Sequence, residues 1–304
     1  MNHTLKEIAV DLANKQPHYV NCLTEESPIL DTMRFEPSSH GLWNAYEEAS
    51  SIEGAAFVDI NQPLPSMHID SDLKKIDLSI LGGEIFLPED KAAVLGVGDY
   101  FAKKLPILLK QAGQTAEQKI IYDNFLPYAI GNGNVEGAGA SASCYSMVAV
   151  RFVEGEVTGL YAPRHMENDG KEGNGIIDVT RINGGVLYKN SDGVLGYGAR
   201  IKGYLGVQLA NPDAVAAIVN ITAAKVPTAA QIDDMLIKAK ANPSNTFIFC
   251  HPKVLSFLNQ YKGNVLQSVS GDWNLNRSFM AWNGIRFVTS YNFKNGTESA
   301  VTLA

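Results

Sequence analysis

Histidine and cysteine are the residues with which proteins most often bind transition metals or build nucleophiles, and this sequence is poor in both. No two of its six histidines have a metal-ligand spacing such as HExxH or HxH. Its three cysteines lie more than 100 residues apart: Cys22, Cys144 and Cys250. A disulfide framework is therefore not indicated, and a reducing compartment is favoured. We expect three buried thiols and no metal site.

The nearest approach to a phosphate-binding loop is Gly131–Gly139. Its third glycine, Gly137, comes one position too late for GxGxxG, and the segment follows a predicted helix where the dinucleotide fingerprint follows a strand. No P-loop and no GxSxG nucleophile motif occurs. Adjacent acidic residues could act as general acids and bases, but all four such pairs lie on polar or helix-capping stretches, which is typical of a solvated surface. The pairs are Glu25-Glu26, Glu47-Glu48, Glu89-Asp90 and Asp233-Asp234. The sequence therefore predicts a protein that is not an enzyme and needs no cofactor.

Length and composition describe a globular chain. Its 304 residues are 45% hydrophobic and 19% charged, which suits one large domain or two smaller ones. No stretch approaches the roughly 18 apolar residues that a membrane helix needs. Charges at Lys6, Glu7 and Asp11 interrupt the first apolar pattern, so it reads as an amphipathic helix and not as a secretory signal. We expect no membrane contact.

Charge is unevenly distributed along the chain. The total is −7, which argues against a dedicated nucleic-acid binder. Residues 1–90 hold 16 acidic and 5 basic side chains, whereas residues 91–304 hold 16 and 20. The acidic first part and the mildly basic second part could complement each other, within one chain or between copies of it.

The first 35 residues are predicted to be helical. Thr4 and Glu7 form a capping box for one helix, and Tyr19–Met33 is a second helical stretch interrupted at Pro28. Residues 36–54 read as a polar linker. Because these helices have too few large apolar residues for a core of their own, they must dock on another surface.

An extended hairpin is predicted next. Ala56–Asn61 and Lys75–Leu81 alternate apolar and polar residues, as strands with one apolar face do, and Gln62–Lys74 forms the tip. Two strands alone are marginally stable in water, so the hairpin needs a neighbour to lie on.

A long helix follows, from Asp90 to Ala112. We expect Pro106 to kink it, Gly113 to end it, and a further helix to run from about Ala116 to Ile130.

The second half of the chain mixes short strands and helices. Helices are predicted from Pro212 to about Val219, after Thr228 with Gln231 completing its capping box, and after Pro252. The predicted strands are Ser146–Val153, Val157–Tyr161, Ile176–Arg181, Val186–Tyr188, Tyr197–Val207, Thr246–Cys250 and Gly284–Ser290.

This order of parts resembles the major capsid proteins of tailed bacteriophages with the HK97-type fold. The resemblance covers nearly the whole chain and is carried by loose patterns: TEESPILDTMRFEPSSHGLWNAYEE, GAAFVDINQPLPSMHIDSDLKKIDLSILGGEIFLPED, the long helix from Asp90, VTGLYAPRH, INGGVLYKNSDG, GYLGVQLANPDAVAAIVNIT, TFIFCHPKVLSFLNQYKGN and WNGIRFVTSYNF.

The resemblance implies an α+β fold with an N-terminal arm, an extended loop (the E-loop), a spine helix, a peripheral domain and an axial domain. The implied ranges are 1–44 for the arm, 45–88 for the E-loop, 89–135 with about 240–304 for the peripheral domain, and 136–239 for the axial domain.

It also implies a function. Copies of the chain would form the hexamers and pentamers of an icosahedral shell, packaging DNA without sequence-specific binding. The protein would be made in the host bacterial cytoplasm and end in the virion. A separate scaffolding protein is expected, because the chain has no long charged helical leader, and a portal is expected too. The implied contacts with neighbouring subunits are Leu64, Met67, Ile69, Lys74 and Lys75 at the E-loop tip, and Leu23, Ile29 and Leu30 in the arm.

Three alternatives stay open. An encapsulin-like nanocompartment shell would share the fold. A two-domain α/β enzyme would place its site near Gly131–Gly139. A tail-tube or decoration protein is disfavoured by the long helix together with the extended loop.

Overall fold

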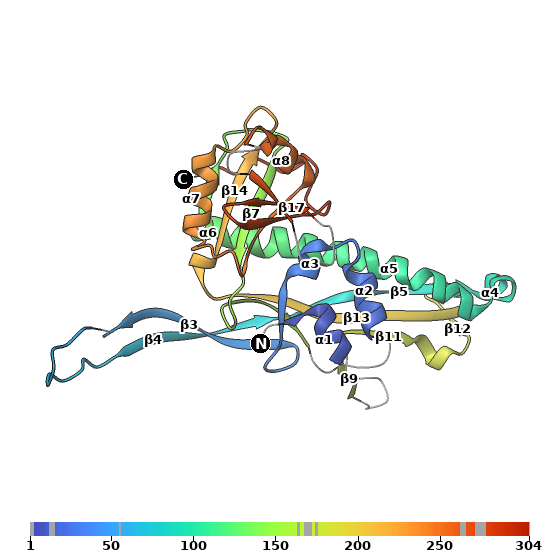
Figure 1. The fold of residues 1–304 in the computed structure, drawn as a ribbon. Helices are drawn as coiled ribbons and strands as arrows, with labels where there is room; N and C mark the ends of the chain where they lie inside the picture. Colours follow the sequence, from blue (N-terminus) through green and yellow to red (C-terminus); the bar gives the residue numbers. More distant parts are fainter. Residues whose placement is uncertain are drawn as a thin grey trace.

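The protein is an α+β chain built from two lobes and a protruding hairpin (Figure 1). This computed structural model describes residues 3–11, 16–54, 56–162, 165–166, 172–173, 176–261, 266–270 and 278–303. The elongated lobe and the compact lobe each contain one seven-stranded sheet. The helix α5 runs along the elongated lobe and passes beneath the compact lobe (Figure 1).

The elongated sheet is organised around one long central strand, β13 (Leu195–Leu209). On one side it pairs antiparallel with β8, β11 and β12, and on the other side with β5. A parallel strand, β2, extends the sheet beyond β8. The bounds of these strands are β1 (His3–Thr4), β2 (Arg34–Pro37), β5 (Ser79–Pro88), β8 (Val157–Tyr161), β11 (Ile177–Arg181) and β12 (Tyr188–Lys189).

The compact sheet has the order β16-β17-β18-β15-β7-β14-β6. Its inner strands are apolar on both faces, because α7 and α8 cover one face and the core shared with α5 and α6 covers the other. The strands are β6 (Val135–Gly137), β7 (Tyr145–Arg151), β14 (Val215–Ile221), β15 (Thr246–Cys250), β16 (Leu266–Ser270), β17 (Ser278–Trp282) and β18 (Ile285–Thr289). The short strands β9 (His165–Met166) and β10 (Glu172–Gly173) pair separately.

The helices and short helical turns complete the element list: α1 (Leu5–Asp11), α2 (Gln16–Thr24), α3 (Pro28–Thr32), α4 (Glu89–Leu95), α5 (Val97–Lys119), the π-helical segment η1 (Ile120–Phe125), α6 (Leu126–Gly131), α7 (Ala229–Lys238), α8 (Pro252–Phe257), and the 3-10 turns η2 (Ile182–Gly185), η3 (Pro212–Ala214) and η4 (Leu258–Tyr261).

The spine helix is longer than predicted. From Val97 to Gly131 it forms one continuous 35-residue rod of α5, η1 and α6. Pro106 lies inside α5 without ending it, and the prediction that Gly113 ends the helix is wrong. Gly113 is buried beneath the arm, where an added Cβ would lie 2.0 Å from the Leu23 carbonyl oxygen. This glycine therefore permits a close approach of two backbones, and the actual break is at Gly96, with φ +74°.

The N-terminal arm folds back on its own subunit. The capping box is present, with the Thr4 N–H donating to Glu7 Oε2 over 2.9 Å. Leu23, Ile29 and Leu30 are fully buried in the core that also contains α5. The expectation that these three side chains contact a neighbouring subunit is therefore corrected. The arm helices, which have few large apolar residues, pack on the core of their own chain.

The hairpin exists, but its strands are displaced from the predicted ones. Its strands are β3 (Trp43–Glu53) and β4 (His68–Asp77), paired antiparallel from Trp43 opposite Asp77 to Glu53 opposite His68. The predicted linker 36–54 thus contains a strand, and the predicted strand Ala56–Asn61 lies in the tip. The sequence of β3, WNAYEEASSIE, shows no sustained alternation of apolar and polar residues, so period-two patterning could not reveal this strand.

One predicted helix is a strand. After the short turn η3, residues 215–221 form β14, which is buried on both faces. Its Ala-rich, non-alternating sequence is that of a central strand, which periodicity does not distinguish from a buried helix. The capping box of Thr228 and Gln231 is confirmed at the start of α7.

The two sheets divide the chain differently from the predicted domain ranges. β15 and β18, from the range 240–304, lie beside β7 in the compact sheet. β8 and β13, from the range 136–239, lie in the elongated sheet.

Candidate assembly interface

The base of the hairpin is fixed on the elongated sheet. The Asn44 Nδ2 group donates to the Gln208 side-chain oxygen on β13 over 2.6 Å. The Trp43 ring stacks on His40 with centroids 3.7 Å apart, and the Lys75 ammonium lies 5.2 Å from the Trp43 ring. Beyond this base the hairpin projects away from the body (Figure 1).

The hairpin tip exposes apolar side chains. Of the predicted contact residues, Leu64 is 79% and Met67 is 66% exposed. Phe57 and Ile60 are almost entirely exposed, and sequence reasoning missed them because it placed them in a strand. Only the backbone of Ile69 is described, in β4 opposite Ile52; its side chain lies outside the described part. A cluster of large exposed apolar residues on a projecting element is typical of an interaction surface.

The two predicted lysines lie on β4 on the way to the base. Lys75 forms an exposed ion pair with Asp77 at 2.9 Å, and such pairs contribute little to stability. Lys74 lines an open depression together with Tyr46 on β3 and Asp123 on the spine helix. Both lysines are therefore placed for surface contacts and not within the tip itself.

A buried carboxylate joins the arm, the spine helix and the C-terminal segment. Glu117 Oε2 accepts the Ile29 N–H at the start of α3 over 3.0 Å, and Glu117 Oε1 accepts the Ser290 hydroxyl. Burial raises the pKa of Glu117 to about 7, against the opposing effect of these hydrogen bonds. Nearer solvent, Lys110 pairs with Glu25 at 2.9 Å. The arm is thus held by polar as well as apolar contacts.

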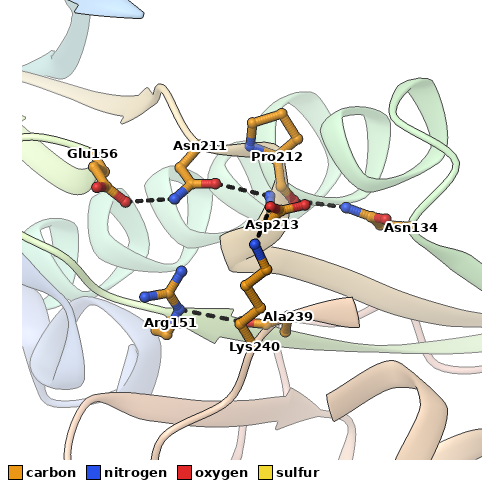
Figure 2. A network of polar contacts seen from close by, with 8 residues as sticks. All are labelled: Asn134, Arg151, Glu156, Asn211, Pro212, Asp213, Ala239 and Lys240. Carbon is orange, nitrogen blue, oxygen red and sulfur yellow. Dashed lines mark hydrogen bonds and ion pairs between the residues drawn. The ribbon is translucent and has the colours of Figure 1, made fainter. Parts of the chain in front are cut away.

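A polar network lies where the chain passes between the two lobes (Figure 2). Asn211 Nδ2 donates to Glu156 Oε2, and Lys240 Nζ contacts Asp213 Oδ2, each over 2.6 Å. Asn134 Nδ2 donates to the Pro212 carbonyl over 2.7 Å. These residues follow α6, β7, β13 and α7, so the network ties together the crossings between the lobes.

One residue of this network, Asn134, belongs to the segment Gly131–Gly139. Its asparagine side chains, Asn132 and Asn134, both donate to backbone carbonyls of this chain. This segment connects α6 to β6, and hydrogen bonds to other parts of the same chain hold it in place.

Within the described part of the chain, no three His, Cys, Asp or Glu side chains form a group that could hold a metal ion. The cysteines are buried, and burial raises the pKa of the Cys250 thiol to about 12, which keeps it protonated. None of the described helices combines the length and apolar character needed to cross a membrane.

Comparison with known proteins gives a fold. No protein-family profile matches the sequence, and no curated protein sequence matches it. The capsid of bacteriophage JBD30 aligns with a TM-score of 0.54 and 12% identity, over 89% of this chain and 92% of that chain. The structure of bacteriophage Epsilon15 aligns with a TM-score of 0.52 and 13% identity, over 89% and 88%.

The likeness to these phage structures extends over both lobes, since it covers about nine tenths of the chain. The resemblance to phage capsid proteins of the HK97 type is therefore confirmed at the level of the fold. An encapsulin complex from Synechococcus elongatus aligns with a TM-score of 0.42 over 62% of this chain.

Proposed function

We propose that this chain is the major capsid protein of a tailed bacteriophage, and that its copies assemble into the hexamers and pentamers of an icosahedral shell around the phage genome. The observation that carries the proposal is the alignment with the JBD30 capsid over 89% of this chain. The protein acts as a structural component and not as an enzyme.

The hairpin supplies the contact between copies in this proposal. Its exposed apolar tip has no covering surface within the described subunit. Burying Leu64 and Met67 on a neighbouring copy removes apolar surface from water, and each Å² removed stabilises the contact by ~25 cal/mol. We place Ile69, Lys74 and Lys75 in the same contact. The arm residues Leu23, Ile29 and Leu30 stabilise the subunit instead.

The remaining parts of the proposal concern partners and domains. A separate scaffolding protein and a portal accompany assembly, the packaged DNA is held without sequence-specific binding, and the mature location is the virion. The elongated lobe corresponds to the peripheral domain with its spine helix, and the compact lobe to the axial domain. This division follows the two sheets.

Negative-stain electron microscopy of the purified full-length chain tests the proposal. Closed polyhedral particles are the expected result, formed by the chain alone or with its scaffolding protein. A uniform monomer under every assembly condition would contradict it. Particles that hold a packaged enzyme in place of DNA in their native host would favour the encapsulin alternative.

A further inference from the structure

The segment that follows β18 connects the spine helix to the compact lobe. Residues 290–303 all lie in the described part of the chain, and they contain no helix and no strand longer than an isolated bridge. Backbone hydrogen bonds attach the segment at Ser290, which donates to the Cys250 carbonyl, and at Glu298, which exchanges two bonds with Cys144. Side chains supply its further attachments. We call residues 290–303 the clasp.

Tyr122 of η1 is the point at which the clasp holds the spine helix. Its hydroxyl donates to Glu298 Oε1 over 2.6 Å and accepts the backbone N–H of Lys294 over 2.8 Å. The Lys294 ammonium lies 4.6 Å from the centre of the Tyr122 ring, and the Phe293 ring packs edge-on against the same ring with centroids 6.4 Å apart. One side chain of the spine helix therefore contacts three residues of the clasp.

The carboxyl group of Glu298 also reaches the compact sheet. Its second oxygen accepts the Ser146 hydroxyl of β7. Further along the clasp, the side-chain amide of Asn220 pairs with the backbone of Val301, donating to its carbonyl and accepting its N–H, each over 2.8 Å. Asn220 has φ +60° and lies where the register of β14 with β7 shifts, an irregularity of the kind that re-aims a side chain. The clasp therefore ties β7 and β14 to the spine helix.

The clasp meets the spine helix at a π-helical segment. η1 lies between α5, which runs along the elongated lobe, and α6, which leads to β6 of the compact sheet (Figure 1). π-helical turns inside α-helices are rare, occur frequently at functional sites, and are places where helices kink. The network of Figure 2 joins the chain crossings to one another, whereas the clasp joins the compact sheet to the spine helix itself.

Burial offsets part of the stability that the carboxyl contacts give the clasp. Glu298 is 9% exposed, and burial raises the pKa of its carboxyl. Burial likewise raises the pKa of Glu117, which accepts the Ser290 hydroxyl, to about 7. Near neutral pH, the cost of burying a charged carboxylate therefore offsets part of what these hydrogen bonds contribute. A segment attached through a few such side chains is expected to open locally before the subunit unfolds.

From these observations we infer that the clasp is a releasable lock between the lobes: closed, it fixes the compact lobe on the spine helix, and open, it lets the angle between the lobes change at η1. The lock belongs to the single subunit, so its test needs no assembly and is independent of the proposed function. In the proposed shell, an adjustable angle would let identical chains occupy both hexamers and pentamers.

Substitution of Tyr122 tests whether the clasp opens as a unit. Tyr122→Phe removes the hydroxyl and keeps the ring, and it removes no hydrogen bond of the Glu298 and Val301 amides. We expect hydrogen exchange at these two amides to become about tenfold faster, because loss of one hydrogen bond to a carboxylate favours opening of the whole clasp. The matched control Tyr261→Phe removes a tyrosine hydrogen bond within the compact lobe, to the Pro227 carbonyl over 3.0 Å, and should leave both rates unchanged.

Two further results separate opening of the clasp from a local or a global effect. The β7 amides of Met147 and Val150 should keep their wild-type exchange rates in Tyr122→Phe; equal acceleration there, or acceleration at the Lys294 amide alone, would overturn the inference. A second readout needs no variant: in the wild-type protein, the Glu298 and Val301 amides should share one opening free energy, below that of β7. Unequal values, or values equal to that of β7, would overturn the inference as well.

A distance measurement tests whether opening changes the angle between the lobes. Spin labels at Lys103→Cys on α5 and Asp234→Cys on α7 occupy exposed positions, and the three native cysteines are buried. Pulsed electron resonance of the unassembled chain should give one narrow distance distribution with Tyr122 present and a broader or shifted one in Tyr122→Phe. An unchanged distribution beside faster exchange of the clasp would overturn the inference, whereas the proposed function would stand.

Discussion

Glu117 shows at residue scale how distant segments of this chain depend on one another. One buried carboxylate accepts hydrogen bonds from the arm at Ile29 and from the C-terminal segment at Ser290. Nothing in the sequence marks Glu117 as different from the chain's other acidic residues. Its environment is created only when α3, α5 and the loop after β18 meet, so sequence reasoning could not find it.

The raised pKa of Glu117 predicts a pH-dependent stability. The pKa of Glu117 rises from 4.5 in the unfolded chain to about 7 in the folded subunit, so folding favours the protonated carboxyl. The resulting stabilisation of the folded state is complete below pH 4.5 and is lost as the pH rises through 7. At ~1.4 kcal/mol per pH unit, ionisation costs the folded subunit roughly 3 kcal/mol. Glu117→Gln should therefore lose much of the decline in unfolding free energy between pH 5 and pH 8, as measured by urea denaturation.

Two comparisons make that measurement decisive. Glu298, which burial also drives to a raised pKa, remains in the variant, so a reduced slope and not a flat one is expected. The wild-type slope, measured in parallel, is the reference. An unchanged slope in Glu117→Gln would contradict the account.

Substitution by alanine should have opposite effects on stability at two glycines of α5, Gly98 and Gly113. Alanine at Gly98 meets no atom within 4 Å and should stabilise the subunit by up to about 1 kcal/mol through helix propensity. Alanine at Gly113 would press on the Leu23 carbonyl at 2.0 Å and should destabilise by about 1–3 kcal/mol. Thermal unfolding of both variants checks the pair; equal melting temperatures would show that the arm does not pack against α5.

At the scale of elements, the arm and the hairpin differ in their packing within the subunit. The arm is part of the subunit core, and the hairpin tip lies outside it. Leu23→Ala should therefore cost the isolated subunit about 2–5 kcal/mol of unfolding free energy. Leu64→Ala should leave that free energy within about 0.5 kcal/mol of wild type. Chemical denaturation of the unassembled proteins measures both.

The reverse pattern would contradict this division. If Leu23→Ala were neutral for the subunit and harmful only to assembly, the arm would belong to a neighbouring molecule, as the sequence first indicated. The structure instead buries Leu23 completely within its own chain.

Local signals in the sequence predicted local structure well. The capping boxes at Thr4 and Thr228 and the strand Val157–Tyr161 formed as expected, because neighbouring residues determine them. The errors concern tertiary context. β3 has no sustained alternation of apolar and polar residues, and β14 does not alternate because both of its faces are buried. Gly113 lies inside the helix because α2 packs there too closely for a Cβ.

The candidate interface was partly predictable for the same reason. The need of an extended hairpin for a neighbouring surface followed from the weakness of two isolated strands, although the alternating stretch Ala56–Asn61 lies in the tip and not in a strand. Its exact strands, and the exposure of Phe57 and Ile60, required the register.

At the scale of the whole molecule, the account holds that the subunit is stable alone and that its hairpin joins it to other copies. Sedimentation velocity of the full-length chain and of a variant lacking residues 57–64 tests this most directly. We predict that the full-length chain forms species far larger than 32.9 kDa, whereas the shortened variant keeps its melting temperature and sediments as a single subunit. If both proteins assemble alike, or if neither assembles under any of the conditions used for microscopy, the central claim is wrong.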